Sequence, residues 1–416
     1  APRTGARLAV GCCGEEAPGG AFPLRVYDVD GGRLLHTFQG HHSLIYDIVW
    51  TPDERYILTT SADGTAKMWY MPPPGLVFPG QGPGSTHKLG TPHSMGHKDS
   101  KSQIATVLSA WQGQGGGGGG NRDDVYSMVQ QSFGQLPSAT DAAEESEQTQ
   151  PPHLVVTLQH RPPTFVYCGL FHCAAAGDPA PPRPHRHVLT AGFDRRLHLW
   201  DTRRGGRHKG TLGGLVQHKS HVNALCWEAK TGRLYSADGA GVILVWRKTG
   251  PGTEPQHFSA VREVRHPQLL GKAVTGLALR PLRRRGQLLV QAAQNCLRLF
   301  DLATFQLVHP GFGGANVTSS RVRCSFSPDG RYAVSGSEDG KVRVWESQTG
   351  RLIRCTLAHF GYPSALLAVA WHPRQHAVAL CSYGPDRPAL LYAHERDPRQ
   401  PPALIQEAAP EEGEGG

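Results

Sequence analysis

Histidine and cysteine are the side chains of this sequence that could hold a metal ion. The chain has 22 histidines and nine cysteines, and its densest group comprises Cys168, His172, Cys173, His185, His187 and His198. Zinc sites usually need paired ligands, such as CxxC followed by a second pair or HExxH on a helix, and neither pattern occurs. Cys168 and Cys173 would also point to opposite faces of a strand. We therefore expect this group to pack inside the fold, and we predict no metal and no cofactor.

Nucleophilic catalysis and phosphate binding are the next chemistries to consider, and the sequence lacks the patterns that both need. No serine lies in a GxSxG turn, and the Asp-Gly pairs fall where repeated turns are expected. The six glycines from Gly115 to Gly120 are not followed by Gly-Lys and a hydroxyl residue, as in a nucleotide-binding loop. The sequence therefore predicts a protein that is not an enzyme and has no catalytic residues.

Positive charge is the third feature that could carry a function. The formal net charge is +9, nine Lys or Arg lie between residues 183 and 221, and residues 283–285 add a second basic turn. Such clusters can contact phosphates. However, Arg195–Arg196 and Arg203–Arg204 are expected at opposite ends of one strand, so a single phosphate track is not expected. We interpret most of these residues as solvated loop residues and predict protein partners rather than nucleic acid.

The elements that position these residues repeat along the chain. From Gly40 to Tyr70, the strand-like segments IYDIVW, YILTTS and TAKMW alternate with the turns TPDE and SADG, which predicts an antiparallel meander. An aromatic residue closes the third strand of successive units, at Trp69, Trp200, Trp246, Phe300, Trp345 and Tyr392. The last four steps are 46, 54, 45 and 47 residues, close to the roughly 40–45 residues of a four-stranded propeller blade. We therefore predict an all-β fold, a seven-bladed propeller.

These units resemble the WD40-repeat family, with Gly40-His41 and Trp200-Asp201 as its two characteristic dipeptides. The resemblance implies a buried network in which a turn Asp bonds a His near the start of the blade, and a Ser or Thr links that His to the Trp. An Asp stands six residues before the closing aromatic in four units, whereas Ala240 and Gln294 stand there in two others. The expected structural network residues are His41, Thr59, Asp63, Trp69, Asp194, Trp200, Ser335, Asp339 and Trp345.

Composition divides the chain into propeller and low-complexity segments. We predict blades one and two over residues 1–71, with the first blade incomplete because its inner strand would precede Ala1. A disordered Gly/Pro-rich insertion is predicted over 72–151, between the third and fourth strands of blade two. The rest of blade two to blade seven is expected over 152–395, without a convincing fourth strand in blade seven, and a disordered acidic tail over 396–416. Inner strands of blades two to seven are predicted at Tyr46–Trp50, Phe165–Phe171, Val222–Trp227, Val274–Leu279, Val322–Phe326 and Leu367–Trp371.

The cysteines and the apolar pattern indicate a compartment. The cysteines are odd in number and lie mostly in apolar runs, which favours a reducing environment. No run reaches the roughly 18 consecutive apolar residues that would span a bilayer. We expect an intracellular protein without a transmembrane segment.

Several segments beyond the repeat pattern resemble the jouberin family of ciliary scaffold proteins. They include HKSHVNALCWEAKTGRLYSADGAGVILVW and ALCSYGPDRPALLY. The resemblance implies a non-enzymatic scaffold or adaptor in cilium assembly, located in the cytoplasm and cytoskeleton, at the basal body and transition zone and at cell junctions. Its implied partners are nephrocystin and other transition-zone proteins. A second hypothesis is a substrate-receptor propeller of a ubiquitin ligase that binds a phosphorylated or acidic peptide.

Partner binding is expected on one face of the disc. In propellers of this family that face carries the turns between second and third strands and the starts of the inner strands. The candidate residues there are Tyr46, Tyr167, Phe193, Arg195, Asn223 and Glu338. Aromatic and arginine side chains often anchor interfaces, but ordinary loop positions explain them equally well.

Overall fold

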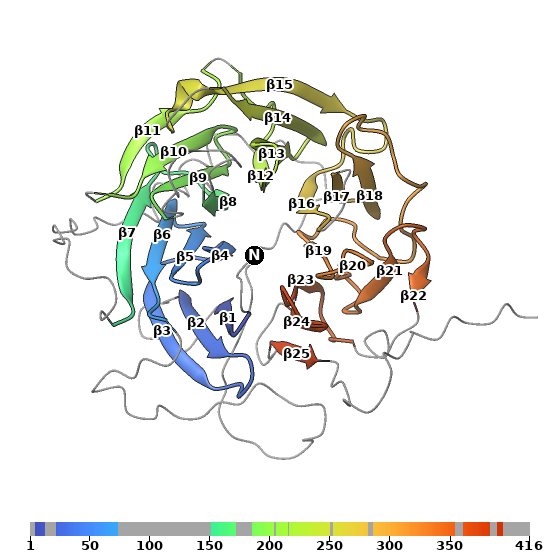
Figure 1. Cartoon of the computed structure of the whole chain (residues 1–416), viewed down its shortest axis with the longest axis horizontal. Helices are drawn as coiled ribbons and strands as arrows, with labels where there is room; N and C mark the ends of the chain where they lie inside the picture. The colour runs from blue at the N-terminus through green and yellow to red at the C-terminus, as the bar shows by residue number, and fades with distance from the viewer. Residues whose placement is uncertain are drawn as a thin grey trace, which may run out of the picture.

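The chain folds into a ring of seven antiparallel sheets around a central axis, as the computed structural model in Figure 1 shows. The structure describes residues 5–12, 22–73, 151–171, 185–203, 205–214, 216–249, 253–281, 286–353, 361–382 and 389–393. The predicted all-β, seven-bladed propeller is confirmed. The predicted acidic tail and almost all of the predicted insertion lie outside the described residues.

The first three blades contain strands β1 to β11. Blade one joins β1 (Arg7–Gly11), β2 (Phe22–Asp28) and β3 (Leu34–His41). Blade two joins β4 (Ile45–Trp50), β5 (Tyr56–Ser61), β6 (Thr65–Tyr70) and β7 (His153–Gln159). Blade three joins β8 (Val166–Phe171), β9 (His187–Gly192), β10 (Leu197–Asp201) and β11 (Arg207–Thr211). Because β7 pairs with β6, the chain returns to blade two where the sequence predicted its fourth strand.

The remaining four blades contain strands β12 to β25. Blade four joins β12 (Val222–Glu228), β13 (Arg233–Asp238), β14 (Val242–Lys248) and β15 (Phe258–Arg265), with the short 3-10 helix η1 (Pro255–His257) before β15. Blade five joins β16 (Val274–Leu279), β17 (Gln287–Ala292) and β18 (Cys296–Asp301). Blade six joins β19 (Cys324–Phe326), β20 (Tyr332–Ser335), β21 (Arg343–Glu346) and β22 (Leu352–Ile353). Blade seven joins β23 (Leu366–Trp371), β24 (Ala377–Ser382) and β25 (Leu390–Ala393). The six predicted inner strands agree with β4, β8, β12, β16, β19 and β23 to within two residues.

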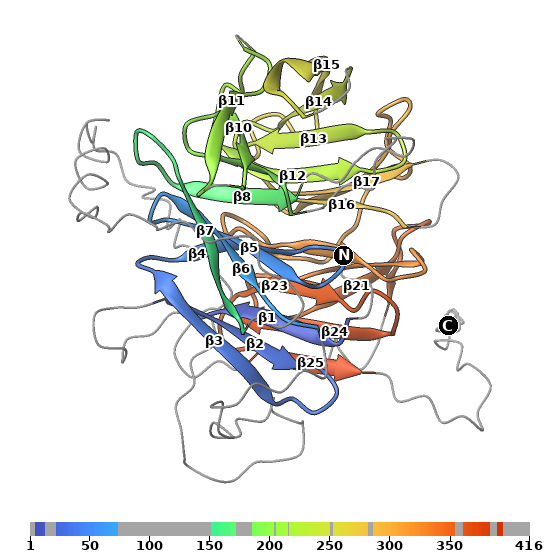
Figure 2. The same ribbon diagram turned by 60° about the vertical axis from the view of Figure 1, so that its left-hand side comes forward.

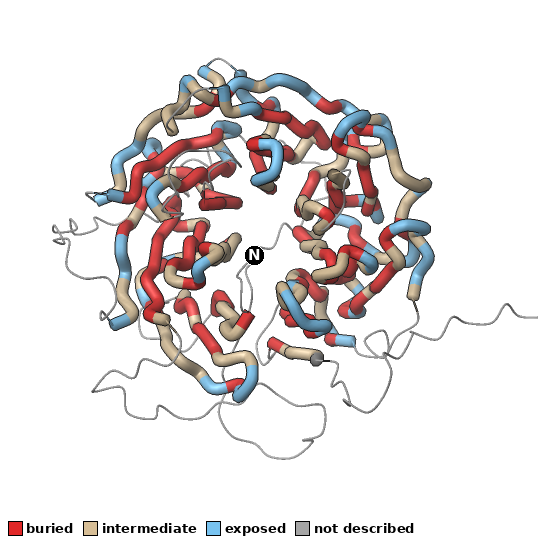
Figure 3. Tube along the Cα trace, viewed as in Figure 1, coloured by how far each residue is buried: buried red, intermediate tan, exposed pale blue. Residues whose placement is uncertain are grey.

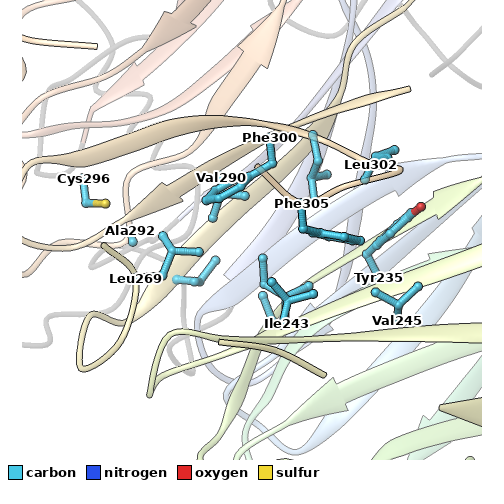
Figure 4. Packing of buried hydrophobic residues seen from close by; sticks show 14 residues of the cluster. Tyr235, Ile243, Val245, Leu269, Val290, Ala292, Cys296, Phe300, Leu302 and Phe305 are labelled. Carbon is cyan, nitrogen blue, oxygen red and sulfur yellow. The ribbon is translucent and has the colours of Figure 1, made fainter. Parts of the chain in front are cut away.

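The hydrophobic core is divided among the spaces between neighbouring blades. Side chains of a strand alternate between its two faces, so a blade covered on both sides needs apolar residues at consecutive positions. Every residue of β5 is accordingly buried. Figure 4 shows one such core, where Tyr235 and Ile243 of blade four point toward Val290 and Phe300 of blade five. Buried residues follow the inner and middle strands around the ring, whereas exposed residues concentrate toward its outer edge (Figure 3).

The first and last blades pack against each other and close the ring. Val10 and Tyr27 of blade one share a buried cluster with Cys381 of blade seven. Figure 2 shows the blue strands of blade one beside the red strands of blade seven. The contact buries apolar faces of the end blades, which would otherwise meet water.

In the described part of the chain, no helix is both long enough and apolar enough to span a membrane. Its cysteines are free thiols, at positions Cys12, Cys168, Cys226, Cys296, Cys324 and Cys381. Burial raises the pKa of Cys226 to about 12, so this thiol stays protonated and packs as a small apolar group.

Candidate functional site

Blade two contains a complete buried polar network. His41, the last residue of β3, contacts Asp63 through Nδ1 at 2.7 Å and Thr59 through Nε2 at 2.7 Å. The indole of Trp69 donates to the Thr59 hydroxyl at 2.9 Å. Burial alone would raise the pKa of Asp63, but the contact with His41 and the hydrogen bonds from Thr65 together lower the pKa to about 2. The carboxylate therefore stays charged, and these side chains hold the turn between β5 and β6 in place.

Blade four contains a second complete network, which the sequence prediction missed. His218 contacts Asp238 at 2.9 Å and Ser236 at 2.7 Å, and Trp246 donates to Ser236 at 2.8 Å. Asp238 stands eight rather than six residues before the tryptophan, so it was not recognised. The signal that could have found it is the hydroxyl, because Ser236 lies 18 residues after its histidine and ten before its tryptophan, as Thr59 does.

Blade three departs from the expected arrangement. Thr190 accepts from Trp200 at 2.8 Å and contacts Nε2 of His160 at 2.8 Å, which matches the other networks. The carboxylate of Asp194, however, contacts Nε2 of His198 at 2.5 Å. The prediction that Asp194 bonds the histidine near the start of its blade is therefore wrong, because a second histidine on β10 takes its place.

Blade six does not form the predicted network either. The indole of Trp345 donates to the carbonyl of Gly313 at 2.8 Å, and Ser335 donates to Gln291 of the neighbouring blade at 3.0 Å. The position 18 residues before Ser335 is Val317, which is buried and cannot donate or accept through its side chain. Without a histidine to join them, the serine and the tryptophan find separate partners.

Asp339, the turn carboxylate of blade six, pairs with an arginine instead of the expected histidine. It contacts the guanidinium of Arg343 at 2.6 Å, near solvent. Burial favours a higher pKa for Asp339, but the hydrogen bond from Arg343 lowers it below its usual value. Asp339 is thus an exposed ion-pair partner and not a member of a buried network. Asp386, which stands six residues before Tyr392 and is the fourth Asp at this spacing, lies outside the described residues.

The basic residues around β10 are divided by that strand, as the sequence predicted. Arg195 and Arg196 precede β10, whereas Arg203 follows it and pairs with Asp201 at 2.7 Å.

The cluster of histidines and cysteines predicted to pack inside the fold does not form one group, because His185 stacks on Tyr56 of blade two, with ring centroids 4.3 Å apart. Residues 172–184, with His172 and Cys173, and the basic turn at 283–285 lie outside the described residues.

The starts of the inner strands bring three of the candidate partner-binding residues together. Tyr46 of β4 and Tyr167 of β8 meet edge to face, with ring centroids 5.0 Å apart. The guanidinium of Arg321 lies over both rings, 4.2 Å from the centre of Tyr167 and 5.4 Å from that of Tyr46. Arg321 also donates to the side-chain oxygen of Asn223 of β12 at 3.1 Å. The sequence prediction missed Arg321, which comes from the loop before β19 and meets these residues only in the closed ring.

Among the described residues, no carboxylate pairs with the guanidinium of Arg321. Arg323 pairs with Asp47 at 3.4 Å, whereas Arg321 contacts only aromatic faces and amide oxygens among the interactions found in the described residues. Burial lowers the pKa of Arg321, and the neighbouring charge of Arg323 lowers it further. Its Nε is buried without a hydrogen-bond partner in the described part of the chain. An unpaired buried cation of this kind costs stability, which suggests a role other than stabilising the fold.

An aromatic run connects this centre to the surface. Phe165 stacks on Tyr167 with centroids 6.2 Å apart, and Phe193 meets Phe165 edge to face, also at 6.2 Å. The amide of Phe193 donates to the carbonyl of Phe165 at 3.0 Å, which fixes the β9–β10 turn beside the start of β8. Phe193 is 39% exposed. We call Phe193, Phe165, Tyr167, Tyr46 and Arg321 the aromatic face.

The other two candidate residues occupy turns. Arg195 adopts a left-handed backbone with φ of 67°, and its carbonyl accepts from the amide of His218 in the next blade at 3.2 Å. Glu338 binds the loop at residues 318–320, because its carboxylate accepts from the amides of Ser319 and Ser320 and from the hydroxyl of Thr318. Burial would raise the pKa of Glu338, but these hydrogen bonds lower it to about 2. Arg195 is therefore an exposed cation next to Phe193, whereas the carboxylate of Glu338 is already occupied.

A histidine beside the aromatic face gives stability a pH dependence. Burial, reinforced by the charge of Arg321, lowers the pKa of His221 to about 4 from the ordinary value of 6.5. Between these two values the unfolded chain binds a proton that the folded chain does not, so stability is full above about pH 6.5 and falls as the pH drops toward 4. The slope from this group is at most about 1.4 kcal/mol per pH unit. Urea unfolding at pH 7.5 and pH 5 should show a smaller difference for His221→Gln than for the wild type, and equal differences would contradict this assignment.

The comparisons with known proteins agree with the repeats and the ring. The WD domain, G-beta repeat (WD40) family profile matches residues 32–70 and 311–346. The β-propeller domain of Cps50 (Swd1) from Myceliophteria thermophila covers 95% of both chains with a TM-score of 0.57 at 15% identity, which shows the fold alone. The chain is a seven-bladed β-propeller, and two of its segments are similar to the WD40 repeat.

Within this class the chain is jouberin-like. It is 24% identical to jouberin of Mus musculus and 25% identical to jouberin of Rattus norvegicus, in each case over 93% of this chain. Autophagy-related protein 16 of Arabidopsis thaliana is 28% identical but over only 40% of this chain. The chain spans 28% of the length of either jouberin.

Proposed function

We propose that this chain is a non-enzymatic scaffold that binds protein partners through the aromatic face. The aromatic face is the observation that carries the proposal, since it leads without interruption from the exposed Phe193 to the buried Arg321. A few residues carry most of the binding energy at protein interfaces, and aromatic rings and arginine are enriched among them, particularly where surrounding contacts exclude water. The likeness to jouberin over nearly the whole chain supports the same class of function.

The same likeness supports a proposal for the cellular setting of this scaffold. We propose that it acts in cilium assembly at the basal body and transition zone, and at cell junctions, with nephrocystin among its partners. The buried histidines, serines and aspartates of blades two and four are already used in hydrogen-bond networks, which suits a rigid platform. No reacting group is needed for this function.

Proximity labelling from the tagged full-length protein in ciliated cells tests the proposal. The wild type should enrich transition-zone proteins, and Phe193→Ala should reduce that enrichment by roughly tenfold or more, because it removes an exposed anchor. The matched control is Val261→Ala, an exposed apolar residue of β15 on the outer edge of blade four, which should leave the enrichment unchanged.

Two outcomes would contradict the proposal. Enrichment of cullin-ligase subunits or RNA-processing factors without ciliary proteins would refute the ciliary setting. Equal losses with Phe193→Ala and Val261→Ala would refute the aromatic face as the binding surface. Circular dichroism of both variants shows whether each remains folded.

A further inference from the structure

The polar group of blade three differs from its counterparts in the number of histidines around the turn carboxylate. In blades two and four, one histidine lies between the carboxylate and the hydroxyl, as with His41 and His218. In blade three, two histidines, His160 and His198, surround Asp194. One nitrogen of each ring and one oxygen of Asp194 all lie within 4.8 Å of one another. Two imidazoles and one carboxylate are three of the ligands that divalent transition metals prefer.

An unpartnered nitrogen lies in this group. His160 is 1% exposed, and its Nδ1 has no hydrogen-bond partner among the described residues. The corresponding nitrogens of His41 and His218 each contact a carboxylate, at 2.7 and 2.9 Å. A buried polar atom without a partner costs free energy, so native proteins rarely retain one without a bound water, ion or ligand. A ligand bound by Asp194 and His198 would give this nitrogen a partner.

Each histidine also has the second contact that metal-binding histidines require. Nε2 of His198 contacts the carboxylate of Asp194. The other ring nitrogen of His198, Nδ1, contacts Nε2 of His208 at 3.0 Å. His160 contacts the Thr190 hydroxyl through Nε2 at 2.8 Å, which leaves Nδ1 for a ligand. Such outer contacts fix the tautomer and the ring orientation of metal-binding histidines.

We propose that His160, Asp194 and His198 form a zinc-binding site. Nδ1 of His160, Nε2 of His198 and one carboxylate oxygen of Asp194 would be the protein ligands, and water would take the fourth tetrahedral position. Zinc fits better than magnesium or calcium because two of three ligands are imidazole nitrogens. Zinc–ligand bonds of about 2.0–2.2 Å require ligand atoms to shift by about 1 Å from their present positions. The side chain of Asp194 is 25% exposed, so the ion can enter from solvent on that side.

The site joins two blades. His160 follows β7 of blade two, and its amide donates to the carbonyl of Gly64 in the turn of that blade at 3.2 Å. Asp194 and His198 belong to the β9–β10 turn and to β10 of blade three. A zinc ion at this position therefore links the end of the outer strand of blade two to the turn that carries Phe193.

Metal binding to the purified full chain tests the proposal. After removal of metals with a chelator and dialysis against zinc, elemental analysis should find one zinc ion per chain, and zinc should raise the thermal unfolding midpoint. Asp194→Asn and His198→Gln should each weaken zinc binding, measured by competition with a chromophoric chelator, by more than about 100-fold. Asp339→Asn is the matched control, since it changes the turn carboxylate of blade six, which pairs with Arg343. The affinity of this variant for zinc should equal that of the wild type.

Cobalt gives an independent readout that needs no variant. Cobalt bound to the wild type should show the visible absorption of a tetrahedral site without the charge-transfer bands of thiolate ligands. Failure of the folded wild type to bind zinc with this stoichiometry would overturn the proposal. Thiolate bands, or unchanged affinity in folded Asp194→Asn and His198→Gln, would overturn it as well by placing the ion elsewhere.

Discussion

Replacement of Asp238 by alanine is expected to lower the free energy of unfolding by about 3–5 kcal/mol, because it breaks a fully buried hydrogen-bond network. The side chains of both Asp238 and His218 are 0% exposed. Asp238 also accepts from the amides of Ala240 and Val242 at 2.9 Å. The substitution therefore leaves one imidazole nitrogen and two amides without partners in the interior, where each unsatisfied group costs about 1–3 kcal/mol.

Urea unfolding of Asp238→Ala and Asp339→Ala, each compared with the wild type, checks this expectation. Asp339 is a turn aspartate of the same kind of blade, but its ion pair with Arg343 lies near solvent, so its loss should cost less than about 1 kcal/mol. Similar costs for the two substitutions would mean that the network of blade four does not hold the fold. The ranking is the reverse of the one that the sequence pattern predicts, since Asp339 fits the six-residue spacing and Asp238 does not.

Gly241→Ala is expected to destabilise the fold by about 2–5 kcal/mol, for two reasons that add together. Gly241 has φ of +84°, a backbone conformation that alanine adopts at a cost of about 1–2 kcal/mol. A Cβ at this position would also lie 1.8 Å from the carbonyl oxygen of Leu269 and 3.0 Å from that of Lys272. These atoms belong to the backbone between blades four and five, so they can move only if the loop moves with them.

Gly271→Ala separates the two causes. Gly271 has a similar φ of +76°, but a Cβ there would meet nothing within 4 Å. Its substitution should cost only the conformational part, about 1–2 kcal/mol. A thermal or urea unfolding series should therefore place Gly271→Ala between the wild type and Gly241→Ala. Equal costs at the two glycines would show that the loop after β15 yields easily and that packing between these blades is not tight.

The network of blade three could be predicted from the sequence only in part. The hydroxyl and the tryptophan could be found, because Thr190 and Trp200 are ten residues apart, as in the other networks. The partner of Asp194 could not, because His198 competes with His160 for the same carboxylate and only side-chain geometry decides between them. The likeness of Asp339 to Asp63 was wrong for a different reason, which the sequence itself contains: the Asp spacing is shared, but Val317 stands 18 residues before Ser335, where the histidine would be.

The sequence by itself determined the number and kind of blades and the position of their inner strands. Alternation of apolar residues, turn residues and closing aromatics are local properties, and neighbouring strands of a meander pair with each other. The tertiary structure alone decided the aromatic face and the group around Asp194. Arg321 reaches Tyr46 and Tyr167 only because the ring closes and brings the starts of β4, β8 and β19 together around the central axis. Contacts between blades depend on which side chains meet across the ring, and the spacing of residues along the chain does not predict these meetings.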